Sequence, residues 1–249
     1  MLDVLKTIEH TSISGSVKRS PLIVELVGPP GAGKTTFAEM LQKRNKSIFI
    51  GSTPYFRKTE YVPFFIKNTL LMMPTFFRIK PNNEGKWLTK YELAYMVVLR
   101  GWHHLLQRER SKGETILVLD EGPISILANL IVYASDSLRS QSAKFWWERM
   151  YRHWAKVVDV AIRFDTPDKT LVQRIRLRDM WHEVKMLPDR DAFNYLDHVR
   201  DAQGVVLTAL TSDSRGPRVL DFNTWQKSPE QIYAEVAKIF SLEQAGDCI

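Results

Sequence analysis

The sequence has 249 residues, 44% of them hydrophobic and 25% charged, which is typical of a globular protein and excludes a disordered chain. The length suits one sizeable α/β domain or two small ones, and the single cysteine, Cys248, excludes an internal disulfide and fits a reducing compartment. A net charge of +7 and a pI near 9.4 suit anionic partners such as nucleotides, nucleic acid or an acidic membrane surface, without selecting among them.

The N-terminal residues are polar and rich in serine, and we expect a flexible leader over residues 1–20. They contain no apolar core ahead of a small-residue cleavage site, so no signal peptide is predicted. The most apolar stretch, residues 62–79, is interrupted by Lys67, Arg78 and two prolines, and is not expected to span a membrane. A cytoplasmic location is therefore the expectation.

The first predicted strand, Leu22–Val27, leads directly into Gly28-Pro29-Pro30-Gly31-Ala32-Gly33-Lys34-Thr35. This stretch matches G-x-x-x-x-G-K-[ST] between a strand and a helix-forming run that ends near residues 44–45. Glycines let the chain turn sharply and bring backbone amides against a polyphosphate, and the following helix directs its positive dipole end there. We expect Lys34 to reach the β- and γ-phosphates and the Thr35 hydroxyl to bind Mg²⁺. The motif predicts binding of a nucleoside triphosphate.

The central part of the chain is predicted to contain an insertion and a buried strand. A short strand is expected at 47–50. Residues 52–86 are aromatic, basic and punctuated by prolines, so we expect an irregular insertion on the side of a second substrate. A long helix is predicted over 87–110, ended by Gly113, followed by a strand over 115–120.

The C-terminal half continues the alternation of helices and strands. Helices are predicted at 124–133 and 143–155, a strand at 157–164, and a helix opened by Asp165-Thr166-Pro167 with Thr166 as N-cap. A further helix reaches residue 210, and a strand at 218–221 precedes a final helix that starts at a capping box, Ser228-Pro229-Glu230-Gln231. This order predicts an α/β fold: a five-stranded parallel sheet with helices on both faces, in a single domain over residues 21–249.

Two carboxylates follow the strand that ends near residue 120. Asp120 lies where ligands bind in open α/β sheets and is predicted to be the second metal-associated group, although Asp-Glu-Gly is also a common ending of a strand before a turn. Glu121 could be a base that activates the acceptor or a water, or a solvated turn residue, and the sequence leaves both readings open.

Three arginines lie within five residues at Arg174, Arg176 and Arg178. Arginine forks stabilise the charge that gathers on a phosphoryl group in transfer, and residues four apart share a helix face, so Arg174 and Arg178 are expected to act together. The pattern predicts a phosphate-sensing helical lid over residues 174–191. The alternative is an amphipathic helix whose arginines are solvated.

Other polar and aromatic groups carry weaker signals. His103, His104 and His182 lack the spacing of metal ligands, so no zinc site is expected. The aromatic residues at 145–154 have helical spacing and are expected to lie in the core, with base stacking as the minority interpretation. Glu25, inside the first strand, needs a partner, and a basic side chain below the site is one candidate.

Taken in order, the glycine-rich loop, the strand ending in Asp120, the arginine-rich helix and the last strand with its capping box resemble the P-loop kinase superfamily. This superfamily holds nucleoside, nucleotide and small-molecule kinases, and thymidylate kinase is the nearest type over residues 21–240. The resemblance implies a three-layer P-loop NTPase sandwich and metal or acceptor chemistry at Asp120. It also implies lid arginines among the three named above, and an ATP–Mg²⁺ donor held by Gly31, Gly33, Lys34, Thr35 and Thr36.

The chain departs from this family at two acceptor-side positions. Thymidylate kinases carry Asp-Arg after the equivalent strand, where this chain has Asp120-Glu121. Deoxynucleoside kinases place a glutamate before the proline that follows the second strand, where this chain has Thr53. The resemblance therefore supports kinase chemistry without naming the acceptor.

The expected function is transfer of the γ-phosphoryl group of ATP–Mg²⁺ to a small acceptor such as a nucleotide, a nucleoside or a sugar derivative. Two alternatives stay open: an NTP-hydrolysing switch, and a kinase acting on a polynucleotide end or a membrane-borne lipid. No oligomeric state is predicted. The expected catalytic residues are Lys34, Asp120, Glu121, Arg174 and Arg178, the expected acceptor contacts Tyr55, Arg57, Tyr91 and Glu121, and the expected nucleotide contacts the loop 28–36 and Arg174.

Overall fold

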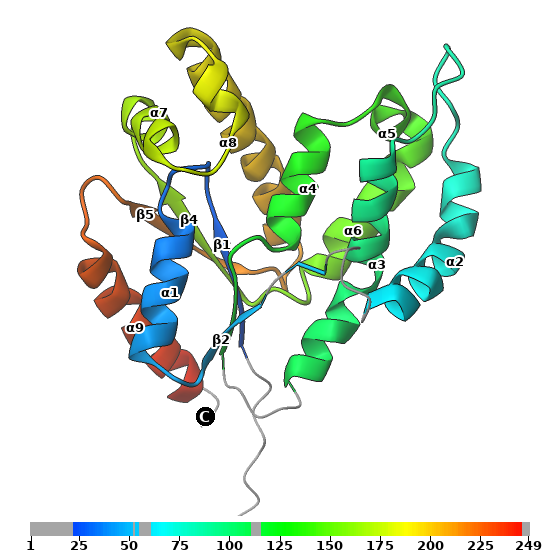
Figure 1. Ribbon diagram of the computed structural model, residues 1–249. Helices are drawn as coiled ribbons and strands as arrows, with labels where there is room; N and C mark the ends of the chain where they lie inside the picture. Colours follow the sequence, from blue (N-terminus) through cyan, green and yellow to red (C-terminus); the bar gives the residue numbers. More distant parts are fainter. Residues whose placement is uncertain (1–21, 52, 55–60, 111–115, 246–249) are drawn as a thin grey trace, which may run out of the picture.

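The computed structural model describes residues 22–51, 53, 54, 61–110 and 116–245. Its strands are β1 (Leu22–Val27), β2 (Ile48–Gly51), β3 (Ile116–Leu119), β4 (Val160–Asp165) and β5 (Arg218–Asn223). All neighbouring strands are parallel, in the order β2-β3-β1-β4-β5 (Figure 1). The predicted five-stranded parallel sheet is confirmed. β3 reads as a continuous apolar run, and β1 as one interrupted only by Glu25, because helices cover both of their faces.

Helices cover the sheet on both sides. On one face α1 (Lys34–Arg44) and α9 (Pro229–Ala245) pack on the sheet through Phe37, Leu41 and Val236, and α7 (Asp168–Leu177) adds to the same cluster. On the other face lie α3 (Lys90–Arg110), α4 (Pro123–Val132), α6 (Lys144–Trp154) and the C-terminal half of α8 (Asp189–Thr211). The result is the expected three-layer sandwich.

The largest difference from the sequence-based expectation is α2 (Val62–Arg78), a helix of 17 residues inside the stretch predicted to be irregular. It packs against α3 on the outer side of the molecule (Figure 1). Pro63 lies in the first turn, where no amide is needed. Pro74 has no amide to donate to the carbonyl oxygen of Leu70. Both residues lie on the exposed side of the helix, so that carbonyl oxygen can bond to water instead.

Two details of α7 also differ from the expectation. Pro167, not Thr166, is the N-cap residue, and no side chain caps this helix. The helix ends at Leu177, and Arg178 already has an extended backbone, so Arg174 and Arg178 do not share a helix face. The prediction that these two arginines lie four apart on one helix is therefore wrong.

The capping box at the start of α9 is confirmed, because the Ser228 amide donates to Gln231 Oε1 at 2.8 Å and the Gln231 amide donates to Ser228 Oγ at 3.3 Å. The aromatic residues of α6 belong to the core as expected, with Trp146 and Trp154 fully buried. No described helix is both long enough and apolar enough to cross a membrane. The predicted leader and Gly113 lie outside the described residues.

Candidate active site

The loop between β1 and α1 brings the chain close to β4 and leaves helix amides free. Gly28 has φ 148°, and a Cβ there would lie 2.3 Å from the carbonyl oxygen of Phe164, so only glycine fits between the loop and the strand. Gly33, with φ 94°, is the N-cap of α1 and supplies no capping side chain. The first amides of α1 are therefore available to an anion at the positive end of the helix dipole.

Thr35 and Asp120 meet at the mouth of this loop. The Thr35 hydroxyl donates to Asp120 Oδ2 at 2.6 Å, although the two residues are 85 positions apart in the chain. The other carboxylate oxygen, Asp120 Oδ1, is buried and has no hydrogen-bond partner among the described residues. An unpartnered buried carboxylate oxygen beside a hydroxyl is a donor set that suits a hard cation such as Mg²⁺.

The Lys34 ammonium lies against the loop, near the carboxylates of Asp120 and Glu121. It donates to the carbonyl oxygens of Gly28 at 2.7 Å and Pro29 at 3.1 Å. Burial lowers the pKa of Lys34, and the charges of Asp120 and Glu121 oppose that shift. The ammonium therefore donates to backbone carbonyl oxygens in this structure, and it could donate to phosphate oxygens in their place.

A hollow of about 210 Å³, which we call the inner hollow, opens between the loop, α4 and α8. Glu121 and Lys34 line it, and Thr53, at the start of the predicted insertion, donates through Oγ1 to the backbone oxygen of Glu121 at 2.9 Å. The remaining lining is mostly polar and comprises Gly28, Pro30, Ser125, Asn129, Tyr133, His182, Tyr195, Val199 and Gln203.

Two of the residues that line the inner hollow, Tyr133 and Tyr195, form a hydrogen-bonded pair. The Tyr133 hydroxyl donates to Glu183 Oε1 and contacts the Tyr195 hydroxyl at 3.1 Å. Glu183 comes from the predicted lid segment. Burial raises the pKa of Tyr195 to about 12 and also raises the pKa of Tyr133, so both phenols stay neutral at physiological pH.

A second hollow, of about 430 Å³, lies on the other side of the loop, and we call it the outer hollow. Arg174 Nη1 donates to the Gly31 carbonyl oxygen at 3.3 Å and lies 3.5 Å from Thr224 Oγ1. The exposed Leu177 and the side chain of Arg178 complete its rim. The lining residues are Gly31, Ala32, Gly33, Thr36, Phe37, Phe164, Arg174, Leu177, Arg178, Thr224, Lys227, Pro229 and Ile232.

The three arginines of the predicted lid thus separate into two groups. Arg174 and Arg178 border the outer hollow beside the loop. Arg176 is turned away, because Nη1 pairs with Asp189 Oδ1 at 2.7 Å and Nη2 donates to the carbonyl oxygen of Leu187 at 2.8 Å. Arg176 therefore ties α7 to the start of α8 and faces no phosphate position.

Glu25 has a different partner from the one suggested by the sequence. Its carboxylate accepts from the amides of Ile124 at 2.9 Å and Ser125 at 2.8 Å, and from the Ser125 hydroxyl at 3.0 Å. It therefore caps the N-terminus of α4. The basic side chain suggested by the sequence is not one of these hydrogen-bond partners, although the charge of Glu25 does oppose the lowering of the Lys34 pKa. Full burial nevertheless raises the pKa of Glu25 to about 7 against these hydrogen bonds, and a Cβ at Gly122 would collide with the carboxylate at 2.3 Å.

Some expected contacts are not brought to the site. Tyr91 is 67% exposed and lines neither hollow, and Tyr55 and Arg57 lie outside the described residues. Sequence reasoning missed Ser125, Asn129 and Tyr133, although their spacing of four residues places them on one face of α4.

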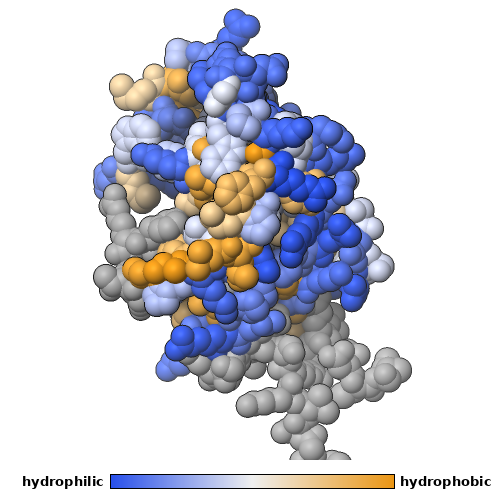
Figure 2. Space-filling view, turned by 90° about the vertical axis from the view of Figure 1, so that its right-hand side faces the viewer, coloured by the Kyte–Doolittle hydropathy of each residue, from blue (hydrophilic) through white to orange (hydrophobic). Residues whose placement is uncertain are grey.

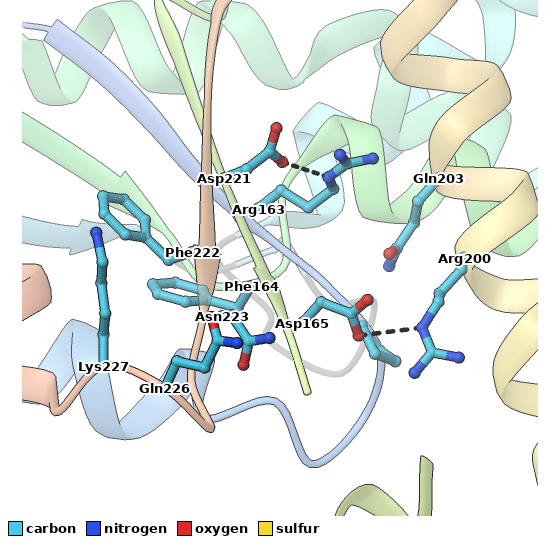
Figure 3. A pocket seen from close by; sticks show the side chains of 11 residues that line it. Arg163, Phe164, Asp165, Arg200, Gln203, Asp221, Phe222, Asn223, Gln226 and Lys227 are labelled. Atoms are coloured by element: carbon cyan, nitrogen blue, oxygen red, sulfur yellow. Dashed lines mark hydrogen bonds and ion pairs between the residues drawn. The ribbon is translucent and has the colours of Figure 1, made fainter. Parts of the chain in front are cut away.

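A third hollow, of about 420 Å³, lies beyond the ends of β4 and β5 (Figure 3). Its charged groups are already matched: Arg163 pairs with Asp221 at 2.5 Å and Arg200 with Asp165 at 3.0 Å. It touches the loop only at Pro29. We assign it no part in the phosphate site.

Comparison with known proteins bears on the fold. A scan against protein-family models finds no match, and a search of curated proteins finds no similar sequence. Among solved structures, a thymidylate kinase from Candida albicans matches with a TM-score of 0.55 and 12% identity, covering 90% of this chain and 93% of that one. A deoxyadenosine kinase from M. mycoides, with bound dATP, matches with a TM-score of 0.49 and 14% identity, covering 88% and 99%.

The first of these matches extends over nearly the whole of both chains, and it agrees with the parallel sheet, the covering helices and the glycine-rich loop described above. The chain therefore has the fold of a P-loop nucleotide kinase.

Proposed function

We propose that this protein is an ATP-dependent phosphotransferase that moves the γ-phosphoryl group to a small acceptor, a nucleotide, nucleoside or sugar derivative. The observation that carries the proposal is the contact of Thr35 with Asp120 at 2.6 Å at the end of a loop whose residues line two separate hollows. A donor and an acceptor can thus approach the same phosphoryl group from opposite sides, as in-line transfer requires.

The outer hollow is the proposed donor side. The amides of the loop and of the first turn of α1, including that of Thr36, would hold the triphosphate, and the base and ribose would occupy the space between Arg174, Leu177 and Thr224. Thr35 and Asp120 would hold Mg²⁺, which when bound offsets negative charge on the phosphate oxygens.

The inner hollow is the proposed acceptor side. An acceptor oxygen forms a bond to Pγ while the bond from Pγ to the bridging oxygen breaks, and the electron pair of that bond leaves on ADP. An acceptor hydroxyl passes its proton to Glu121, whereas an acceptor phosphate needs no base. Lys34, Arg174 and Arg178 would stabilise the charge of the transferred group.

The test is a screen of acceptors with γ-labelled ATP and Mg²⁺, in which the label is followed into product. We expect label on one acceptor class, and loss of that label in Asp120→Asn, while Asp221→Asn in the third hollow keeps it. Release of label only as free phosphate with every acceptor would overturn the proposal in favour of a hydrolytic switch.

A further inference from the structure

Helix α2 exposes a continuous row of large apolar side chains. Phe77 is 77% exposed, Leu70 65% and Ile66 58%, and their spacing follows one side of the helix. Such exposure is unusual for three neighbouring large side chains on one helix of a globular protein. We call the following set the α2 stripe: Val62, Ile66, Leu70, Met73 and Phe77.

The stripe is not simply the outer edge of the core. The opposite side of α2 is already buried through Phe65, Met72 and Phe76. An apolar hollow of about 400 Å³ opens on the helix surface and is lined by Val62, Phe65, Ile66, Thr69 and Leu70. Figure 2, which looks onto the side of the molecule where α2 lies, shows hydrophobic side chains gathered across the middle of the face with hydrophilic ones around them. The helix is therefore apolar on both sides.

The charges along α2 have one sign. Lys67, Arg78 and Lys80 are exposed, and residues 61–83 contain no aspartate or glutamate. Lys67 is adjacent on the helix surface to Leu70 and Leu71, while Arg78 lies 4.1 Å over the ring of Phe145, at the C-terminal end of the stripe. Long cationic side chains can lie along an apolar surface and keep their charged ends in the polar layer above it.

From these observations we propose that α2 docks flat on the surface of an anionic lipid bilayer. The α2 stripe enters the boundary between headgroups and acyl chains, and Lys67, Arg78 and Lys80 contact the anionic headgroups. The helix lies in the plane of the surface and does not cross it.

A second copy of the chain is a poorer occupant. Two copies meeting through α2 would bring Lys67 and Arg78 of both helices to one interface, and α2 contains no aspartate or glutamate to neutralise them. A bilayer surface needs no matching shape and supplies the opposite charge.

The test uses the full chain and vesicles of two compositions: phosphatidylglycerol mixed with phosphatidylcholine, and phosphatidylcholine alone. We expect the protein to sediment with the anionic vesicles and to be released as salt rises. The double variant Ile66→Ser and Phe77→Ser should lose at least tenfold in affinity, since each buried CH₂ contributes to binding. Lys67→Glu should lose about fivefold or more.

Matched controls separate docking from folding and from catalysis. Val205→Ser removes an apolar side chain of similar exposure (54%) from α8 and should leave vesicle binding unchanged. Lys34→Ala should bind vesicles as the parent does, because docking does not depend on the proposed phosphoryl transfer. Light scattering in solution gives the mass of each variant.

Two results would overturn the proposal. One is equal sedimentation with both vesicle compositions, or with neither. The other is a parent dimer that becomes a monomer in the Ile66→Ser, Phe77→Ser variant while no form binds vesicles, which would make the stripe an interface between copies.

Discussion

The two hollows beside the phosphate-binding loop differ in how they are built. The outer hollow joins the loop and α1 to α7 and the start of α9, with apolar side chains such as Phe37, Leu177 and Ile232. The inner hollow takes its polar groups from α4 and α8, as in Asn129 and Tyr195. A local motif thus provides the backbone amides that would hold the donor phosphates, whereas helix packing provides most of the polar groups on the side that would choose the acceptor. Changes in one hollow should therefore leave the other intact.

The largest effect is expected where the hollows meet. Lys34→Ala removes the ammonium that would stabilise the transferred phosphoryl group, and kcat/KM should fall by about 10³-fold with either substrate varied. Steady-state kinetics with γ-labelled ATP measure the loss. Lys43→Ala, an exposed lysine on the same helix, is the control and should keep full activity. Unchanged turnover in Lys34→Ala would contradict the assignment of the loop.

The next effect concerns stability and falls on Glu25, the buried carboxyl group that caps α4. The pKa of Glu25 is about 7 in the folded chain and 4.5 when it is free, so the folded state holds the proton more tightly. Its contribution to stability is complete below about pH 4.5 and is lost as pH rises through 7, a change of about 3 kcal/mol. Urea unfolding of the parent and of Glu25→Gln across this range measures it.

The parent should lose stability relative to Glu25→Gln as pH rises from 4.5 to 8. Amide exchange should show the loss first in α4 and not in α9, because Glu25 holds only the α4 amides. A constant difference between the two proteins over that range would refute this account of Glu25.

A smaller kinetic effect is expected from a change in the outer hollow, and it should concern ATP alone. Arg174→Ala removes a guanidinium beside Gly31, and kcat/KM for ATP should fall by about 30-fold while the KM for the acceptor stays within twofold or so. Arg176→Ala is the matched control: its exposed pair with Asp189 is worth at most about 1 kcal/mol of stability, and both kinetic values should stay unchanged. Equal effects of the two variants would show that Arg174 has no special position.

The smallest kinetic effect is expected from a change in the inner hollow, and it should concern the acceptor alone. Tyr133→Phe removes the hydroxyl that contacts Glu183 and Tyr195, so the KM for the acceptor should rise about fivefold while the KM for ATP stays unchanged. Tyr151→Phe, half-buried on α6, is the control. A change in the KM for ATP alone would mean that donor and acceptor sides are reversed.

Local patterns were sufficient for the loop, the strands and most helices. The mostly apolar stretch of β1, the apolar run of β3 and the spacing of Gly28, Gly33 and Lys34 act over a few neighbouring residues, so the sequence shows them directly. α2 was missed because Pro63 and Pro74 usually break helices. Only the structure shows that one occupies the first turn and the other the exposed side.

The sequence by itself thus determined the fold class and the phosphate-binding loop, because both depend on short-range periodicity and on backbone geometry. Tertiary structure decided which side chains share a site. The strand order β2-β3-β1-β4-β5 places β3 and β4, far apart in the chain, on either side of β1. That arrangement joins Thr35 to Asp120 and Glu25 to the start of α4. No local pattern encodes such contacts, since they arise only when distant elements pack together.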